Sequence, residues 1–304
     1  MPKIPHEGAS LSPVASTSVA ITKSRRSVLL EAMCWTLGFL FAQGLVLAVL
    51  LLVILLATFG MRCPSQSELL AWVLESDLDQ SFLLVGVPVM GAVFVIFPVI
   101  RWREGSEFRQ RIGWRIPTHE EVVYSLAMIV PAALIGDMVY DVASAGMVTQ
   151  SNSLGHLYGT FQGVSYPVLI VALALAPAVL EELVFRGMLG RRLVGRFGTF
   201  WGVLMASSLF AAVHGAPAHA IATLPIGILL HVLYLQTGTI WIPVMVHFGN
   251  NLLALSMVHF HLGNESRVSP MFLAVLCVYL LLMLLLLNQR TRSIGTAQTR
   301  CASS

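Results

Sequence analysis

Residues 164–187 read VSYPVLIVALALAPAVLEELVFRG. A long, mostly apolar run leads straight into the adjacent acids Glu181 and Glu182, and Arg186 follows four positions after the second acid. If the apolar helix ended there, the charges would mark the place where it meets water. If the helix continued, both carboxylates would lie inside a membrane. An unpaired charge there is energetically costly and indicates a functional role.

The composition of the chain favours a membrane. The chain is 57% hydrophobic and 11% charged, with a mean hydropathy of +0.81, which lies outside the range of soluble globular domains. Apolar runs near the length needed to cross a bilayer lie at 32–60, 81–100, 121–140, 165–193, 199–216, 219–236, 239–259 and 270–288. We therefore expect an all-α, polytopic transmembrane helix bundle of about eight spans, in a multi-pass protein of the cell membrane.

These runs also predict the organisation of the chain. Residues 1–26 are polar and rich in Ser, Thr and Pro, so we expect a disordered tail. Residues 27–160 would hold three spans, 161–262 a core of four spans, 263–290 the eighth span, and 291–304 a second tail. Of the 18 lysines and arginines, 16 fall on one side of this arrangement. The positive-inside rule places that side, with both termini, in the cytoplasm.

Several classes of function find no support in the sequence. The four cysteines, at 34, 63, 277 and 301, show neither metal-ligand spacing nor a disulfide framework. There is no glycine-rich phosphate loop and no soluble domain. The net charge of +3 comes mostly from the loops on one side and does not indicate a nucleic-acid partner. We expect the lipid bilayer as the surroundings and no cofactor.

The two glutamates are expected to have different roles. Gly195 and Gly198 are better helix breakers than Arg186, so the helix should continue to about Leu193. Glu181 would then lie roughly 18 Å from that end, deep in a hydrocarbon core about 30 Å thick. Glu182 and Arg186 have the favoured spacing for a helical ion pair. Glu181 points about 100° away around the helix, which leaves it free for chemistry.

Polar pairs on later spans could complete a cavity around Glu181. Phe210 and His214 are one turn apart, and so are His247 and Asn251. Together these residues would provide a second proton-handling group and two polar donors.

Other titratable residues in the spans have simpler explanations. A single histidine in a membrane usually forms a hydrogen bond between helices, which is what we expect of His219 and His231. Asp137 and Asp141 are expected at the membrane interface. Phe210 is expected to pack rather than to take part in chemistry.

The three motifs together resemble those of a known family. Glu-Glu-x-x-x-Arg, Phe-x-x-x-His and His-x-x-x-Asn occur here without substitution and in the order typical of the CPBP family, across roughly 165–260. That family contains CAAX-processing proteases of the Ras-converting type and bacteriocin-processing enzymes. The residues that carry the resemblance are Glu181, Glu182, Arg186, Phe210, His214, His247 and Asn251.

The resemblance implies a CAAX-type glutamic intramembrane endopeptidase. Carried over by position, Glu181 would activate water with the help of His214, and His247 with Asn251 would stabilise the oxyanion. Glu182, Arg186 and Phe210 would support the site. The substrate would be a peptide or protein, such as a prenylated tail, a leader peptide or a sorting tail.

Three alternatives remain open. The first is a non-proteolytic membrane immunity or scaffold protein of the same family, and the second is a transporter. The third is a zinc-dependent membrane protease, because Glu181, His214 and His247 could supply a carboxylate and two imidazoles. Against zinc, these residues lie on three separate spans, and the chain has no His-Glu-x-x-His motif.

Overall fold

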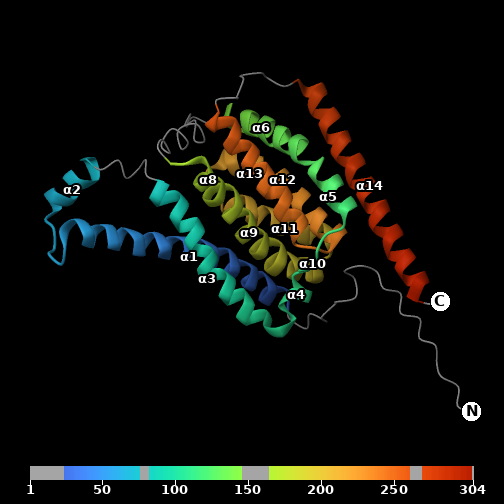
Figure 1. Ribbon diagram of the computed structural model, residues 1–304, viewed down its shortest axis with the longest axis horizontal. Coiled ribbons are helices and arrows are strands. Elements are labelled where there is room, and N and C mark those ends of the chain that lie inside the picture. The colour runs from blue at the N-terminus through green and yellow to red at the C-terminus, as the bar shows by residue number, and fades with distance from the viewer. Residues whose placement is uncertain (1–23, 76–81, 146–163, 261–268, 303–304) are drawn as a thin grey trace, which may run out of the picture.

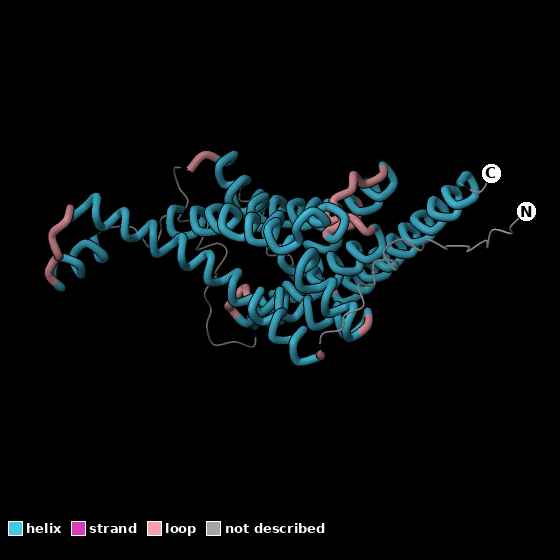
Figure 2. The backbone as a smooth tube through the Cα atoms, turned by 90° about the horizontal axis from the view of Figure 1, so that it is seen from below, coloured by secondary structure: helices cyan, strands magenta, loops and turns pink. Residues whose placement is uncertain are grey.

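The computed structural model describes residues 24–75, 82–145, 164–260 and 269–302, which form helices joined by short turns (Figures 1 and 2). Within these residues, seven helices are long and apolar enough to cross a membrane. They span Arg25–Phe59, Gly86–Arg111, His119–Ala145, Tyr166–Phe197, Pro217–Thr237, Trp241–His259 and Met271–Thr291. The expected all-α, multi-pass membrane fold is confirmed. The remaining expected span is present as a shorter apolar helix, Thr199–Ala212.

The first helices form one side of the bundle. α1 (Arg25–Phe59) packs against α3 (Phe82–Glu104), and its buried residues all lie between Val28 and Ala42. The rest of α1 extends away from the bundle towards α2 (Gln66–Glu75), at the left of Figure 1. The sequence did not predict α2, and α1 begins slightly before the expected end of the tail. Residues 1–23 of that tail lie outside the described residues.

The segment that carries the acid pair is one continuous helical rod with two π-helical stretches. It comprises α8 (Tyr166–Leu169), π-helical Ile170–Leu175, α9 (Ala176–Glu182), π-helical Leu183–Gly190 and α10 (Arg191–Phe197). The rod ends at Gly198, whose φ of 80° suits glycine and few other residues. The prediction that the helix continues past Arg186 is therefore confirmed, with Gly198 as its breaker.

The other core helices surround this rod. α11 (Thr199–Ala212) packs on α10 and on α12 (Pro217–Thr237), and α13 (Trp241–His259) packs on α9. On the outer side, α6 (Ile129–Ala145) contacts α12 and α13, and α14 (Pro270–Ala302) covers α6 and α5 (His119–Leu126) (Figure 1).

Two boundaries differ from the sequence prediction. The third span is interrupted between Leu126 and Ile129, where α5 gives way to α6. α14 continues to Ala302, so the helix of the eighth span extends into residues 291–302. The assignment of a cytoplasmic side to either terminus stays a prediction.

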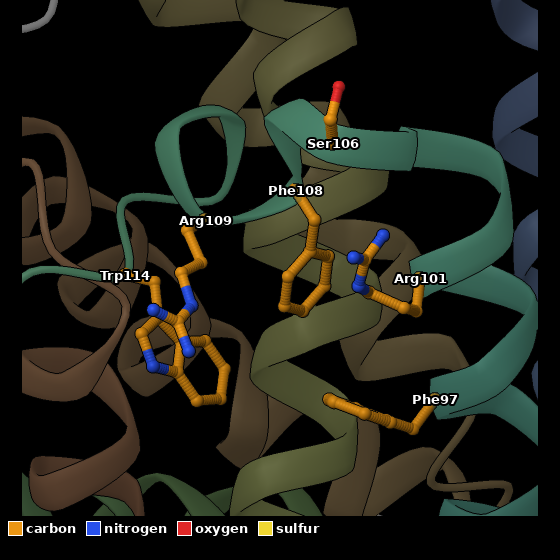
Figure 3. Close-up of a pocket in the computed structure, with 6 residues that line it drawn as sticks. All are labelled: Phe97, Arg101, Ser106, Phe108, Arg109 and Trp114. Carbon is orange, nitrogen blue, oxygen red and sulfur yellow. The ribbon is translucent and has the colours of Figure 1, made fainter.

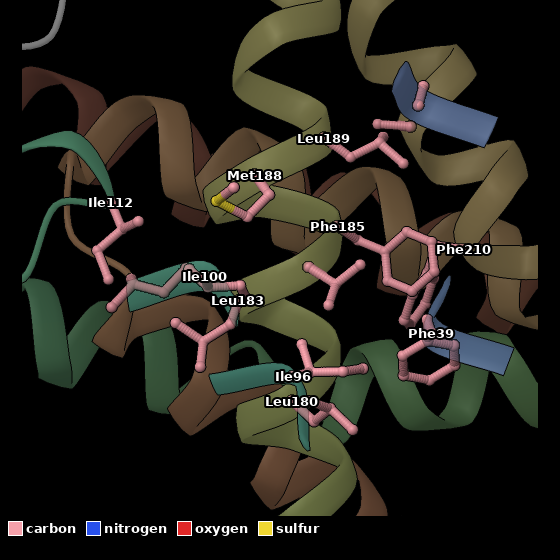
Figure 4. Close-up of a cluster of buried hydrophobic side chains, with 14 of the residues drawn as sticks. Phe39, Ile96, Ile100, Ile112, Leu180, Leu183, Phe185, Met188, Leu189 and Phe210 are labelled. Carbon is pink, nitrogen blue, oxygen red and sulfur yellow. The ribbon is translucent and has the colours of Figure 1, made fainter. Parts of the chain in front are cut away.

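Aromatic side chains fasten the rod to its neighbours in the buried cluster of Figure 4. The ring of Phe185 lies 5.6 Å from that of Phe39 on α1 and 5.4 Å from that of Phe210 on α11, in edge-to-face geometry. Such pairs add about 0.5–1.5 kcal/mol beyond simple burial. The rod is thus held between α1 and α11, which fixes the rotation of the helix that carries Glu181 and Glu182.

Ion pairs bring the basic segments together at one end of the bundle. Glu31 near the start of α1 contacts Arg103 and Arg192, and Glu104 at the end of α3 also binds Arg192. The start of α1, the end of α3 and α10 therefore meet there, and we call this the basic end. Arg62 lies beyond the far end of α1 and pairs with Glu68. The structure thus places three of the basic segments at a common end, as the loop charges predicted.

Candidate active site

The ion pair expected from the sequence lies in the centre of the core. Arg186 donates from Nη1 to Oε1 of Glu182 over 2.7 Å, and the two side chains are 1% and 0% exposed. A guanidinium and a carboxylate removed from water in this way stabilise each other only while both remain. Glu182 is therefore held in an ion pair with Arg186, as predicted.

Two further contacts hold the guanidinium of Arg186. Its Nη2 donates to the backbone carbonyl of Gly227 over 3.0 Å, and its Cζ lies 4.3 Å from the centre of the Phe210 ring. Gly227 also packs closely against Phe210, since a Cβ at that position would lie 3.0 Å from the Phe210 ring. Gly227 was not predicted as a site residue from the sequence. The feature that could have indicated it is a glycine inside an apolar span, two residues after Pro225.

His247 of α13 connects the two glutamates. Its Nδ1 lies 2.8 Å from Oε1 of Glu182, and its Nε2 lies 3.8 Å from Oε2 of Glu181. Only 4% of the residue is exposed. Because an ionised carboxylate only accepts hydrogen bonds, Nδ1 carries a proton when it bonds Glu182. The imidazole orientation is thereby fixed, with Nε2 directed at Glu181.

Glu181 makes fewer polar contacts than Glu182 with the described residues. Its side chain is 12% exposed, and Oε2 is buried without a hydrogen-bond partner among the described residues. The distance of 3.8 Å to His247 is short enough for an ion pair and too long for a direct hydrogen bond. This geometry agrees with the expectation that Glu181 differs from Glu182 in having no cation on its own helix.

His214 lies in a turn and not, as expected, within a helix. α11 ends at Ala212, and Gly215 adopts a φ of 75° that turns the chain towards α12. The correction follows from local backbone geometry, because Gly215 permits a left-handed residue within the predicted span. The Nδ1 of His214 still bonds the carbonyl of Phe210 over 3.0 Å. Since a carbonyl only accepts, Nδ1 donates, which leaves Nε2 as the nitrogen able to accept whenever the ring is neutral.

Phe210 is the point where the three motifs meet. Its ring centre lies 5.1 Å from that of His214 and 5.6 Å from that of His247, and it also receives the Arg186 guanidinium. A change at Phe210 would therefore move both imidazoles. Phe210 packs, as expected, and this packing spaces the polar groups.

Asn251 is the one predicted site residue that the structure does not link to the others. It lies one turn beyond His247 on α13 and is half-buried. Its side chain forms no hydrogen bond with another described residue. The helical spacing from His247 is as predicted, and its participation in the site stays a prediction.

Another buried histidine lies behind Arg186. The ring of His231 on α12 is fully buried, and within the described residues neither of its nitrogens forms the interhelical hydrogen bond expected from the sequence. The absence of a side chain at Gly190 makes room for it, because a Cβ there would lie 2.2 Å from the His231 ring. The ring fills space next to the rod. His219, by contrast, packs edge-on against Tyr140.

The arrangement bears on the zinc alternative. Within the part of the chain that the structure describes, no group of three or more His, Cys, Asp or Glu side chains is arranged to hold a metal ion. His247 faces Glu181, whereas His214 bonds the backbone carbonyl of Phe210 in α11. The carboxylate and the two imidazoles of the candidate zinc set do not form a ligand group in this structure.

Comparison with known proteins identifies the segment that holds this cluster. A sequence profile of the type II CAAX prenyl endopeptidase Rce1-like family matches residues 163–253. This segment, under a third of the chain, is similar to that family. All seven motif residues lie inside the Rce1-like segment, and the helices before 163 and after 253 lie outside it.

A curated relative gives the same indication. The chain is 28% identical over 91 residues to a protein of Bacillus subtilis (strain 168) named "Putative membrane peptidase YdiL". The match covers 30% of this chain and 37% of that protein, so little more than a third of the relative is represented. No solved structure matches the chain. The printed name of this relative, like the family profile, points to a membrane protease.

Proposed function

We propose that this chain is an intramembrane endopeptidase that hydrolyses a peptide bond in a membrane-associated peptide or protein by means of glutamate-activated water. The observation that carries the proposal is the contact of His247 with both Glu181 and Glu182, beside Phe210 and His214. The similarity of residues 163–253 to the Rce1-like family supports the same reaction class.

In this proposal Glu181 is the general base. A water molecule loses a proton to the Glu181 carboxylate while its oxygen forms a bond to the carbonyl carbon of the substrate. Nε2 of His214, an acceptor nitrogen in the neutral ring, orients the water from the other side. When the C–N bond breaks, the proton held by Glu181 passes to the leaving nitrogen. Base catalysis of this kind contributes about 10²–10⁴-fold.

His247 and Asn251 are the proposed donors to the oxyanion. Since Nδ1 donates to Glu182, Nε2 can donate only when the ring carries both protons. Preorganised donors in a dry cavity stabilise a developing oxyanion strongly. The pair of Glu182 and Arg186 would keep His247 in place.

The decisive experiment compares precursors and products in membranes. Cells lacking the protein would be supplied with the wild-type chain, Glu181→Gln, or the matched control Glu68→Gln, which makes the same change at an exposed position outside the bundle. We expect proteomics to find uncleaved membrane-associated precursors with Glu181→Gln and mature products with the other two. If no precursor distinguishes the three samples, proteolysis is excluded and the non-proteolytic family role takes its place.

Chelation separates water activation by glutamate from activation by a metal. We expect the purified protein to keep full cleavage activity towards a precursor so identified after dialysis against a strong chelator. Loss of activity that zinc restores, with one metal bound per chain, would establish the zinc-dependent mechanism.

The orientation of the site is open to a labelling test. In a chain without the other native cysteines, Ser106→Cys and Gly195→Cys are exposed positions at the basic end, and native Cys63 is exposed at the far end of α1. In sealed right-side-out vesicles we expect an impermeant thiol reagent to label Cys63 at once. It should reach positions 106 and 195 only after the vesicles are opened. The opposite pattern would place the basic end outside.

A further inference from the structure

A pocket lined by two arginines lies at the basic end of the bundle, apart from the three motifs. After α3 the chain forms the short turns Gly105–Glu107 and α4 (Phe108–Arg111) and then runs to the start of α5. A cavity of about 380 Å³ opens between these turns and the end of α3 (Figure 3). It is lined by Phe97, Arg101, Ser106, Phe108, Arg109 and Trp114.

The two arginines of this pocket differ from the other arginines of the same loop. Of the five between 101 and 115, three form ion pairs: Arg103 with Glu31, Arg111 with Glu104 and Glu107, and Arg115 with Glu121. Arg101 and Arg109, which line the pocket, have no carboxylate partner among the described residues. The unpaired positive charge of this loop is therefore gathered in one cavity.

The pocket walls are held in place without a ligand. The guanidinium of Arg101 donates to the carbonyl of Gly105 and lies 5.8 Å from the centre of the Phe108 ring. Trp114 packs against Trp241 at the start of α13, with ring centres 4.5 Å apart. A binding site whose walls are already ordered loses little entropy when it is occupied.

Backbone contacts next to the pocket fasten the loop to the core. The carbonyl of Gly113 accepts a hydrogen bond from the Ile240 amide over 3.0 Å. Gly113 adopts a φ of 69°, and a Cβ there would lie 2.4 Å from the carbonyl oxygen of Gly238. The loop is thus attached to the turn between α12 and α13, and the pocket is a fixed part of the bundle.

Exposed tryptophans indicate the depth of the pocket in the membrane. Trp102, next to Arg101 on α3, is 83% exposed, and Trp201 near the start of α11 is 59% exposed. Both lie at the basic end, because Arg191 and Arg192 of α10 bind Glu104 just before α11 begins. Tryptophans with this exposure are typical of the membrane–water interface, where lipid headgroups lie. The pocket opens at that level.

We propose that the pocket binds the phosphate of an anionic phospholipid headgroup. Guanidinium groups form paired hydrogen bonds with phosphate oxygens, and Ser106 adds a hydroxyl donor beside them. The surface of an anionic leaflet attracts basic segments by about 1 kcal/mol per charge. The chemistry shared with free phosphate is the anionic phosphoryl group, and the position at headgroup depth favours the lipid. This assignment does not depend on the proposed proteolysis.

A thermal-stability titration of the full-length protein in zwitterionic detergent tests the assignment. The probes are short-chain phosphatidylglycerol, short-chain phosphatidylcholine and inorganic phosphate. We expect phosphatidylglycerol alone to raise the melting temperature to a plateau, from which an apparent Kd follows. Arg101→Gln combined with Arg109→Gln should weaken that Kd about thirtyfold, the equivalent of two surface charges.

The matched control removes two arginines from the same end of the bundle. Arg25→Gln with Arg26→Gln makes the same change in net charge at exposed positions that line no described pocket. The proposal requires this control to keep the wild-type Kd within about twofold. If both double variants weaken binding equally, the attraction is diffuse and the pocket has no special role.

A single variant and the titration with inorganic phosphate cover the remaining outcomes. If the double variant does not fold, Arg109→Gln alone, at an exposed side chain, should weaken binding about fivefold. A single variant with the wild-type Kd would overturn the proposal. Stabilisation by inorganic phosphate with an affinity equal to that of phosphatidylglycerol would assign the pocket to a free anion rather than to a lipid.

Discussion

Two buried charge clusters lie along the same helical rod, and they differ in the sign of their excess charge. At the basic end, the carboxylate of Glu104 receives Arg192 at 2.6 Å, Arg191 at 3.1 Å and Arg111 at 3.5 Å. Both of its oxygens are engaged, and the three arginine side chains remain 18–34% exposed. In the core, Glu182 binds the guanidinium of Arg186, and Glu181 and Glu182 share the imidazole of His247, all nearly buried.

This difference separates a structural cluster from a reactive one. Excess positive charge at the basic end can be hydrated, so it costs little and fastens α3 to α10. An excess carboxylate in the interior is costly, and proteins keep such groups mainly where they function. Four substitutions test this difference between the two clusters, in order of decreasing expected effect.

Glu181→Gln should have the largest effect on activity. Removal of the proposed base should lower the cleavage rate about 10²–10⁴-fold, while the similar shape preserves the packing. The rate would be measured with purified protein on a precursor found by proteomics, and folding by the melting temperature. Cleavage above a tenth of the wild-type rate would remove Glu181 from the role of base.

Glu182→Gln should have the largest effect on folding. It leaves Arg186 buried at 1% exposure without a counter-charge and weakens the hold on His247. Loss of one partner from a buried pair costs about 3–5 kcal/mol. The measurement is the amount of folded protein in membranes and its free energy of unfolding in mixed micelles. A Glu182→Gln chain as stable as wild type, beside an unstable Glu181→Gln chain, would reverse the two roles.

Glu104→Gln should destabilise the fold less and leave catalysis intact. Its three arginines are partly exposed, so water can replace part of the lost interaction. We expect a loss of about 1–3 kcal/mol in the free energy of unfolding. Activity per folded molecule should equal that of the wild type. A catalytic defect in fully folded Glu104→Gln protein would show that the two clusters are coupled.

Glu107→Gln should have the smallest effect of the four on the free energy of unfolding. Glu107 pairs with Arg111 on the surface, where the two side chains are 55% and 34% exposed. Exposed pairs contribute about 0–1 kcal/mol. Unfolding experiments should find no change beyond that range, in salt or without it. A larger loss would mean that exposure is a poor guide to the strength of these pairs.

The parts of this fold that follow from local sequence could be predicted. Apolar length located the spans, and the four-residue spacing of Glu182 and Arg186 predicted their ion pair because neighbours on one helix face are fixed by helical geometry. The charge counts of the loops likewise indicated which segments meet at a common end. None of these inferences needs knowledge of how one helix rotates against another.

The contacts between helices could not be predicted in the same way. His247 reaches Glu182 across 65 positions of sequence, and its partner depends on the tilt and rotation of α13 against the rod. The hydrogen bond from Arg186 to the carbonyl of Gly227 spans 41 positions of sequence and likewise depends on how α12 lies against the rod. The end of α11 before His214 was missed because the run stays apolar through the turn, so hydropathy does not mark the break.

The π-helical stretch Leu183–Gly190 begins just after Glu182, contains Arg186 and ends just before Arg191. A π-helical turn holds one residue more than an α-helical turn, so it acts as an inserted residue. Each residue turns an α-helix by about 100°, and the stretch therefore sets the angle between the face that holds Glu182 and the face that holds Arg191. Deletion of one residue here would keep every charged side chain in the chain, yet it would rotate α10 out of phase with the core. The length of this stretch thus fixes the rotation of one charge cluster relative to the other. After a single-residue change in length, the ion pairs of both clusters could not form at the same time.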